Sequence, residues 1–98
     1  MKTYTICGSM RFEKEMQEIA YDLETRLGYN ILQCVYCPDN VMPDAEASIR
    51  LAVAHYRKID LSDGIYVVNV DGYIGASVKE EIAYAQKCGK EILYHCKA

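Results

Sequence analysis

Residues 70–90 read VDGYIGASVKEEIAYAQKCGK, and they combine the end of an apolar run, a glycine-rich loop and an amphipathic helix. Ser77 and Glu80 have the Ser-x-x-Glu spacing of a capping box, which predicts that the helix starts at Ser77. Gly89 stands where a left-handed residue ends a helix. Strand, loop and helix in this order are the repeating unit of an α/β fold.

Glu81 follows the capping glutamate but lies on a different side of the predicted helix. It comes three residues after Val78 and four before Ala85, on or beside the apolar stripe that should face the sheet. Two interpretations are open. Acidic residues are common in the first turns of helices, where the dipole stabilises them by about 0.3–1 kcal/mol. Alternatively, the carboxylate lies at a strand–loop–helix junction, where open α/β sheets bind ligands.

The rest of the chain repeats the same unit. Its apolar periodicity predicts helices near 12–27, 44–58 and 77–88 and strands near 3–7, 30–36, 64–70 and 91–95. Short connections in the order βαβαβαβ predict right-handed crossovers and a parallel sheet with helices on both faces. With the first and third strands at the centre, the expected fold class is α/β, a three-layer sandwich with a four-stranded parallel sheet of order 2-1-3-4.

Composition limits the function classes. The chain has 98 residues, which suits one domain over 1–98, a net charge of −3 and a pI near 5.3. Neither a basic patch nor a basic amphipathic helix occurs, which argues against nucleic-acid and membrane partners. Apolar runs fall short of the roughly 18 residues that span a bilayer. We therefore expect a cytoplasmic protein that acts on a small molecule or a protein.

The cysteines favour neither disulfides nor a metal. Five cysteines are an odd number, which argues against a disulfide framework. Cys34 and Cys37 form a Cys-x-x-Cys pair, but Pro38 follows them instead of a helix, and no second pair completes a zinc site. We expect no metal and no cofactor.

The loop after the first strand is a second candidate site element. Gly8, Ser9, Met10 and Arg11 combine backbone N–H groups, a hydroxyl and a guanidinium at a helix N-terminus, which is a plausible anion site. Ser9 as a simple N-cap and Arg11 as a solvated surface charge are the plain alternatives. This loop and residues 71–77 should face each other across the crevice at the switch point between strands 1 and 3.

Three segments together resemble a known family: residues 7–11 (CGSMR), 62–70 (SDGIYVVNV) and 81–90 (EIAYAQKCGK). They look like the nucleoside 2-deoxyribosyltransferase family, and the first segment is most similar to its 2′-deoxynucleoside 5′-phosphate N-hydrolase branch. The resemblance covers nearly the whole chain in the right order. Its most specific piece is the Glu-x-x-x-Ala-x-x-x-Gly-Lys helix.

The resemblance implies a flavodoxin-like, Rossmann-like sheet and a glutamate nucleophile that attacks C1′ of the deoxyribose, here Glu81. The implied reaction is N-glycosidic bond cleavage or deoxyribosyl transfer on a nucleoside or nucleoside 5′-monophosphate. The loop of residues 8–11 would hold the sugar and the 5′-phosphate. Ser77, or the backbone of Gly75, would match the family's serine that helps to bind phosphate.

Two further residues are candidates for substrate contacts. The family's sugar-contacting aspartate falls nearest His55 in this sequence, with Asp60 close by. Without the resemblance, a histidine late in a helix is more often a surface residue or a dipole partner than an acid or a base. Tyr73, in the loop over the crevice, is the tyrosine we would place against a base or sugar.

Two other functions stay open: a nucleotide-binding module without chemistry, such as a subunit of a larger assembly, and a purely structural dimer. We expect a homodimer, because the predicted second helix has Leu51, Val53 and Tyr56 around much of its circumference. The resemblance also implies sites near subunit contacts.

Overall fold

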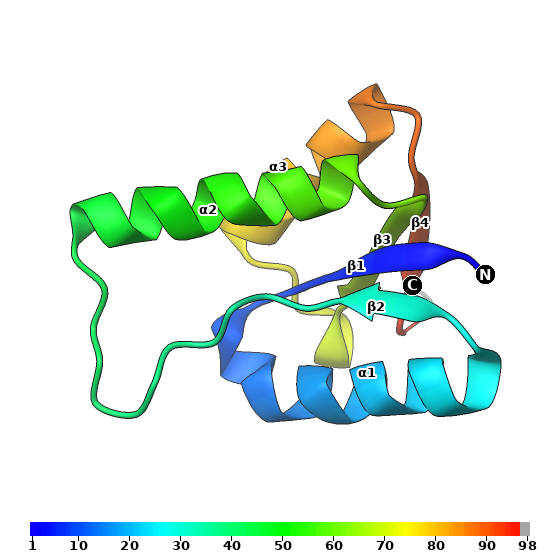
Figure 1. Cartoon of the computed structure of the whole chain (residues 1–98), viewed down its shortest axis with the longest axis horizontal. Helices are drawn as coiled ribbons and strands as arrows, with labels where there is room; N and C mark the ends of the chain where they lie inside the picture. The colour runs from blue at the N-terminus through cyan, green and yellow to red at the C-terminus, as the bar shows by residue number, and fades with distance from the viewer. Residues whose placement is uncertain (97–98) are drawn as a thin grey trace.

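The computed structural model describes residues 1–96, which form a parallel sheet between two helical layers. The strands are β1 (Thr3–Gly8), β2 (Asn30–Leu32), β3 (Gly64–Val68) and β4 (Glu91–Tyr94), in the order β2-β1-β3-β4. The helices are α1 (Glu13–Leu27), α2 (Ala45–Asp60) and α3 (Ala76–Lys87). Figure 1 shows α1 on one face of the sheet and α2 and α3 on the other. The predicted α/β class, strand order and flavodoxin-like three-layer arrangement are confirmed.

β1 and β3 form the centre of the sheet. β1 pairs in parallel with β2 on one side, Tyr4 opposite Ile31, and with β3 on the other, Tyr4 opposite Gly64. β3 in turn pairs with β4, Gly64 opposite Glu91. A Cβ at residue 64 would overlap the carbonyl oxygen of Glu91, so glycine is needed where these strands begin.

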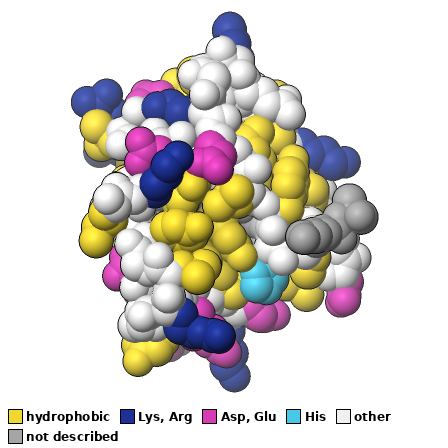
Figure 2. All heavy atoms as spheres, turned by 90° about the vertical axis from the view of Figure 1, so that its right-hand side faces the viewer, with side chains coloured by type: hydrophobic (Ala, Val, Ile, Leu, Met, Phe, Trp, Pro, Cys, Tyr) yellow, Lys and Arg dark blue, Asp and Glu magenta, His cyan; other side chains and the backbone are white. Residues whose placement is uncertain are grey.

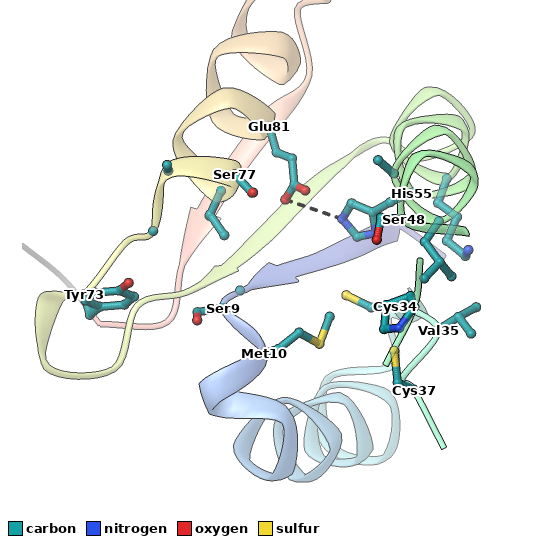
Figure 3. Close-up of a pocket in the computed structure, with 18 residues that line it drawn as sticks. Ser9, Met10, Cys34, Val35, Cys37, Ser48, His55, Tyr73, Ser77 and Glu81 are labelled. Carbon is teal, nitrogen blue, oxygen red and sulfur yellow. Dashed lines mark ion pairs between the residues drawn. The ribbon is translucent and has the colours of Figure 1, made fainter. Parts of the chain in front are cut away.

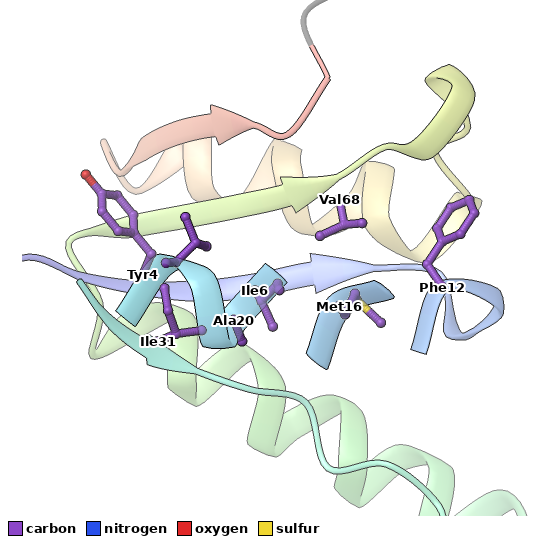
Figure 4. Packing of buried hydrophobic residues seen from close by; sticks show 8 residues of the cluster. Tyr4, Ile6, Phe12, Met16, Ala20, Ile31 and Val68 are labelled. Atoms are coloured by element: carbon purple, nitrogen blue, oxygen red, sulfur yellow. The ribbon is translucent and has the colours of Figure 1, made fainter. Parts of the chain in front are cut away.

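Alternate residues of the central strands form two separate cores. The core beneath α1 contains Tyr4, Ile6, Phe12, Met16, Ala20, Leu23, Ile31 and Val68 (Figure 4). The core beneath α2 and α3 contains Cys7, Ile59, Ile65, Val67, Val78 and Ala85. Because neighbouring strand residues point to opposite faces, Ile6 and Cys7 belong to different cores.

The second strand is shorter than the sequence predicted. β2 ends at Leu32, where its pairing with β1 stops, and residues 33–38 are not part of the sheet. An edge strand with one neighbour is held only as far as that pairing extends. Cys34 and Tyr36 still pack against the core beneath α1, which explains the apolar pattern that suggested a longer strand.

The predicted start of the third helix is wrong, whereas its end is confirmed. Gly75 is the N-cap of α3, and no side chain of the described residues caps it, so Ser77 and Glu80 do not form the capping box. At the other end Gly89 has a φ of 69°, and Lys90 N–H donates to the Ala85 carbonyl oxygen at 2.9 Å. Gly75 enters the helix from an extended conformation, which places Ser77 inside the first turn.

The sheet edge at β4 is only partly covered. Ile92 and Leu93 are half-buried, and Tyr94 is exposed. Figure 2 shows the side of the molecule that lies on the right in Figure 1, where hydrophobic side chains gather among charged ones.

None of the described helices combines the length and the apolar character that crossing a bilayer requires.

Candidate functional site

A pocket opens where β1 and β3 end, between the loop after β1, α2 and the first turns of α3. Its volume is about 500 Å³, within the range of small-molecule sites. Apart from Arg11, the predicted site residues all line it: Gly8, Ser9, Met10, His55, Tyr73, Gly75, Ser77 and Glu81. The carboxyl ends of parallel strands thus bring together segments far apart in the sequence.

Glu81 lies in the second turn of α3 and points into the pocket towards α2 (Figure 3). Its side chain is 14% exposed, and Oε1 lies 3.5 Å from Nε2 of His55. Glu80, one residue earlier, is exposed. The spacing argument therefore separated the two glutamates correctly, although its other half, the capping role of Glu80, is wrong.

His55 is buried, contrary to the surface position that its place late in a helix suggested. It lies on the face of α2 that also buries Ile59, one turn later, and its residue exposure is 8%. Nε2 lies 3.4 Å from Sγ of Cys7, and Nδ1 has no hydrogen-bond partner among residues 1–96. Burial lowers the pKa of His55, but contacts with Cys34, Cys7 and Glu81 outweigh it and raise the pKa above its usual value. The same ring nitrogen, Nε2, thus lies against both the Cys7 thiol and the Glu81 carboxylate.

Cys7 completes the cluster and was not singled out from the sequence. It is fully buried near the end of β1, and burial raises the pKa of its thiol to about 12, although the His55 contact opposes this. Strand alternation could have assigned Cys7 to the face opposite Ile6. Its meeting with His55 depends on how α2 packs, for which the sequence has no comparable signal.

The three side chains have the residue types of a thiol nucleophile, base and orienting acid, but not the geometry. In such a triad the nucleophile and the acid contact different ring nitrogens of the histidine. Here both Cys7 and Glu81 lie against Nε2. Since Cys7 is also fully buried, a bound substrate can reach the Glu81 carboxylate and the His55 ring but not the thiol.

The start of α3 gives one end of the pocket a set of backbone N–H donors. Ala76, Ser77 and Val78 line the pocket in the first turn, where backbone N–H groups have no partner within the helix. Ser77 is an exposed residue of this turn and does not cap the helix. A helix N-terminus of this kind favours phosphate or carboxylate groups.

Arg11 and Asp60 lie outside the pocket lining. The Arg11 guanidinium stacks on the Tyr73 ring, 3.9 Å from its centre, and Tyr73 does line the pocket, so Arg11 lies beside the site. Ser9 Oγ accepts a weak hydrogen bond from Arg11 N–H at 3.4 Å, the capping role left open as an alternative. Asp60 accepts a hydrogen bond from the Tyr84 hydroxyl instead of facing the pocket, and we no longer expect it to contact a sugar.

No protein-family model, curated protein or solved structure matches this chain in the three comparisons.

Proposed function

We propose that this protein cleaves the N-glycosidic bond of a nucleoside or nucleoside 5′-monophosphate, by hydrolysis or by transfer to a second base, with Glu81 as nucleophile. The main support is the largely buried Glu81 carboxylate in a pocket of about 500 Å³ at the carboxyl edge of a parallel sheet. Such a volume is large enough for a nucleoside monophosphate. The motif resemblance to nucleoside 2-deoxyribosyltransferases points to the same chemistry.

The reaction is a double displacement. A Glu81 carboxylate oxygen forms a bond to C1′ while the bond from C1′ to the base nitrogen breaks, and the departing base takes the electron pair and then a proton from solvent. Water, or the nitrogen of a second base, attacks C1′ of the glycosyl-enzyme from the side that the base has vacated, and the attacking group loses a proton to solvent. This step releases the Glu81 carboxylate.

His55 prepares Glu81 for this role. The His55 ring holds Oε1 at 3.5 Å, which leaves the second carboxylate oxygen to attack. His55 is thus a positioning residue in this proposal, in place of the family's sugar-contacting aspartate.

The phosphate would occupy the opposite end of the pocket. The first turn of α3 with Ser77, the loop of residues 8–10 and the nearby Arg11 supply N–H, hydroxyl and guanidinium donors. Binding the phosphate there uses a remote group to align C1′ with Glu81. Tyr73 offers a partly exposed ring for the base or sugar.

We also propose that the protein is a homodimer. Within α2 the fully buried residues are His55 and Ile59, whereas Ile49 and Val53 on its outer side are 65% and 64% exposed. A second copy would cover this apolar surface symmetrically. Light scattering at micromolar concentration should give twice the 11.1 kDa chain mass, and an 11 kDa particle would contradict the dimer.

The deciding experiment measures free base released from deoxynucleosides and their 5′-monophosphates. Glu81→Gln keeps the side-chain shape and should lower kcat/KM by about 10³-fold or more, as removal of a nucleophile does. The matched control Glu80→Gln changes an exposed neighbour and should retain activity. Full activity in Glu81→Gln, or equal loss in both variants, contradicts the nucleophile.

Inactivity of the parent protein would favour the other two functions. A melting temperature raised by deoxynucleoside monophosphates would then indicate a nucleotide-binding module without chemistry. No shift with any of these ligands would leave the structural dimer.

A further inference from the structure

Three potential metal ligands from three different elements lie together at the pocket, and two of them, His55 and Glu81, line it. Cys7 comes from β1, His55 from α2 and Glu81 from α3, and their ligand atoms all lie within 4.8 Å of one another. The sequence-based expectation of no metal considered only the Cys34 and Cys37 pair. Such a cluster exists only once the sheet and both helices are packed together.

The separations of these atoms suit a tetrahedral ion. Zinc binds sulfur at about 2.3 Å, nitrogen at about 2.0–2.1 Å and carboxylate oxygen at about 2.0–2.2 Å, so neighbouring ligand atoms in a tetrahedron lie about 3.4–3.6 Å apart. Nε2 of His55 lies 3.4 Å from Sγ of Cys7 and 3.5 Å from Oε1 of Glu81. The third separation, between Sγ of Cys7 and Oε1 of Glu81, is within 4.8 Å, so one cation bound to Nε2 would draw these two atoms towards each other.

The donor types indicate which cation. A thiolate and an imidazole favour zinc and similar transition metals, whereas calcium and magnesium prefer oxygen ligands. Cys7 closes the cluster from the sheet side, and His55 and Glu81 line the pocket. Three protein ligands with a fourth position open to a pocket are the arrangement of an accessible zinc site, not of a closed structural one.

We propose that Cys7, His55 and Glu81 bind one zinc-class divalent cation, and that the bound ion blocks Glu81. Binding forms three metal–ligand bonds and releases the Cys7 thiol proton, and any proton on Nε2 of His55, to solvent. Metal binding stands independently of the reaction; the blocking effect rests on the proposed function. A coordinated carboxylate is held by the ion and is a poorer nucleophile at C1′.

Titration of the metal-free protein with Co²⁺, followed by competition with Zn²⁺, tests the binding. We expect one ion per chain, the visible bands of tetrahedral cobalt and a thiolate-to-cobalt band in the near ultraviolet. Zn²⁺ should displace the cobalt and abolish these bands. Cys7→Ser should weaken binding by more than about 10-fold, since the loss of even an outer-shell partner has that effect.

Other variants identify the ligands and control for folding. His55→Gln and Glu81→Gln should also weaken binding, and they decide the result if Cys7→Ser fails to fold by circular dichroism. Cys88→Ser, at an exposed cysteine outside the pocket, is the matched control and should bind like the parent. Binding that is lost in Cys37→Ser but unchanged in Cys7→Ser would overturn the assignment in favour of the Cys34 and Cys37 pair, and absence of tetrahedral cobalt bands would overturn it outright.

Base release measured with and without Zn²⁺ tests the blocking effect. Zinc should inhibit the parent protein, and a chelator should restore its activity. Zinc that binds at this cluster without inhibiting would overturn the blocking effect alone. If the parent releases no base, the cobalt titration still decides whether the metal site exists, so the two proposals fail separately.

Discussion

The two faces of the sheet are covered in different ways. Beneath α1, apolar residues such as Ile6, Met16 and Val68 are almost completely buried and form a continuous core. Beneath α2 and α3, Cys7 of the sheet lies against His55 of α2, next to the largely buried Glu81 of α3. Burying polar groups costs free energy unless they have partners, and here Nε2 of His55 contacts both Cys7 and Glu81 beside a pocket. The first face is an apolar core throughout, whereas the second combines an apolar core with a polar site.

Truncating one core residue on each face should show this division. Leu23→Ala and Ile59→Ala both create cavities and should lower the free energy of unfolding by about 2–5 kcal/mol. Leu23 belongs to the core beneath α1, so activity measured well below the melting temperature should survive. Ile59 lies one turn from His55, and its loss should also lower activity. Urea unfolding and base release check both, and equal activity in the two variants would contradict the division.

The proposed anion-binding end of the pocket should be separable from stability. Ser77→Ala should lower kcat/KM for a deoxynucleoside monophosphate by about 10- to 100-fold, because a hydrogen bond to a charged group contributes about 1.5–3 kcal/mol. The parent nucleoside, which lacks the phosphate, serves as the control substrate and should be little affected. Because Ser77 does not cap α3, the melting temperature should not fall. A stability loss without a substrate difference would restore the capping role.

The start of α2 should depend on its own cap. Asp44 accepts a hydrogen bond from Ala47 N–H at 2.8 Å, and Asp44→Ala should lower the free energy of unfolding by about 1 kcal/mol. Ser77→Ala is the matched comparison, since the sequence placed a cap there and the structure does not. Chemical denaturation of the two variants gives the difference; equal losses would contradict it.

The smallest effect is a pH dependence at the start of β4, where Tyr4 meets Glu91. A hydrogen bond from the Tyr4 hydroxyl, 2.7 Å away, lowers the pKa of Glu91, and Lys2 assists. A lowered folded-state pKa contributes stability above the unfolded value of about 4.3, and this contribution is lost as the pH falls through the folded value. Tyr4→Phe should therefore flatten the acid limb of a stability–pH curve between about pH 3 and 5. Tyr21→Phe, at an exposed tyrosine, should leave that limb unchanged.

The sequence by itself determined the elements, their order and the side on which several residues lie. Helical spacing placed Glu81 towards the sheet, and Gly89 ended α3 as predicted. Ile6 and Cys7 are consecutive in β1, so their side chains point to opposite faces of the sheet. These features depend on local periodicity and on backbone conformations that few residues adopt. The parallel direction of the strands then follows from the short connections between strands and helices.

Only the tertiary structure decided which of these residues meet. The burial of His55, its contact with Cys7, the entry into α3 at Gly75 and the early end of β2 all depend on how one element packs against another. The sequence predicted a capping box at Ser77, but the helix begins after the extended Gly75. It also suggested a surface position for His55, which instead lies on the buried face of α2. Periodicity predicts which side of its own helix or strand a side chain lies on. This site requires three elements to meet at one point, and their relative placement results from packing of the whole core.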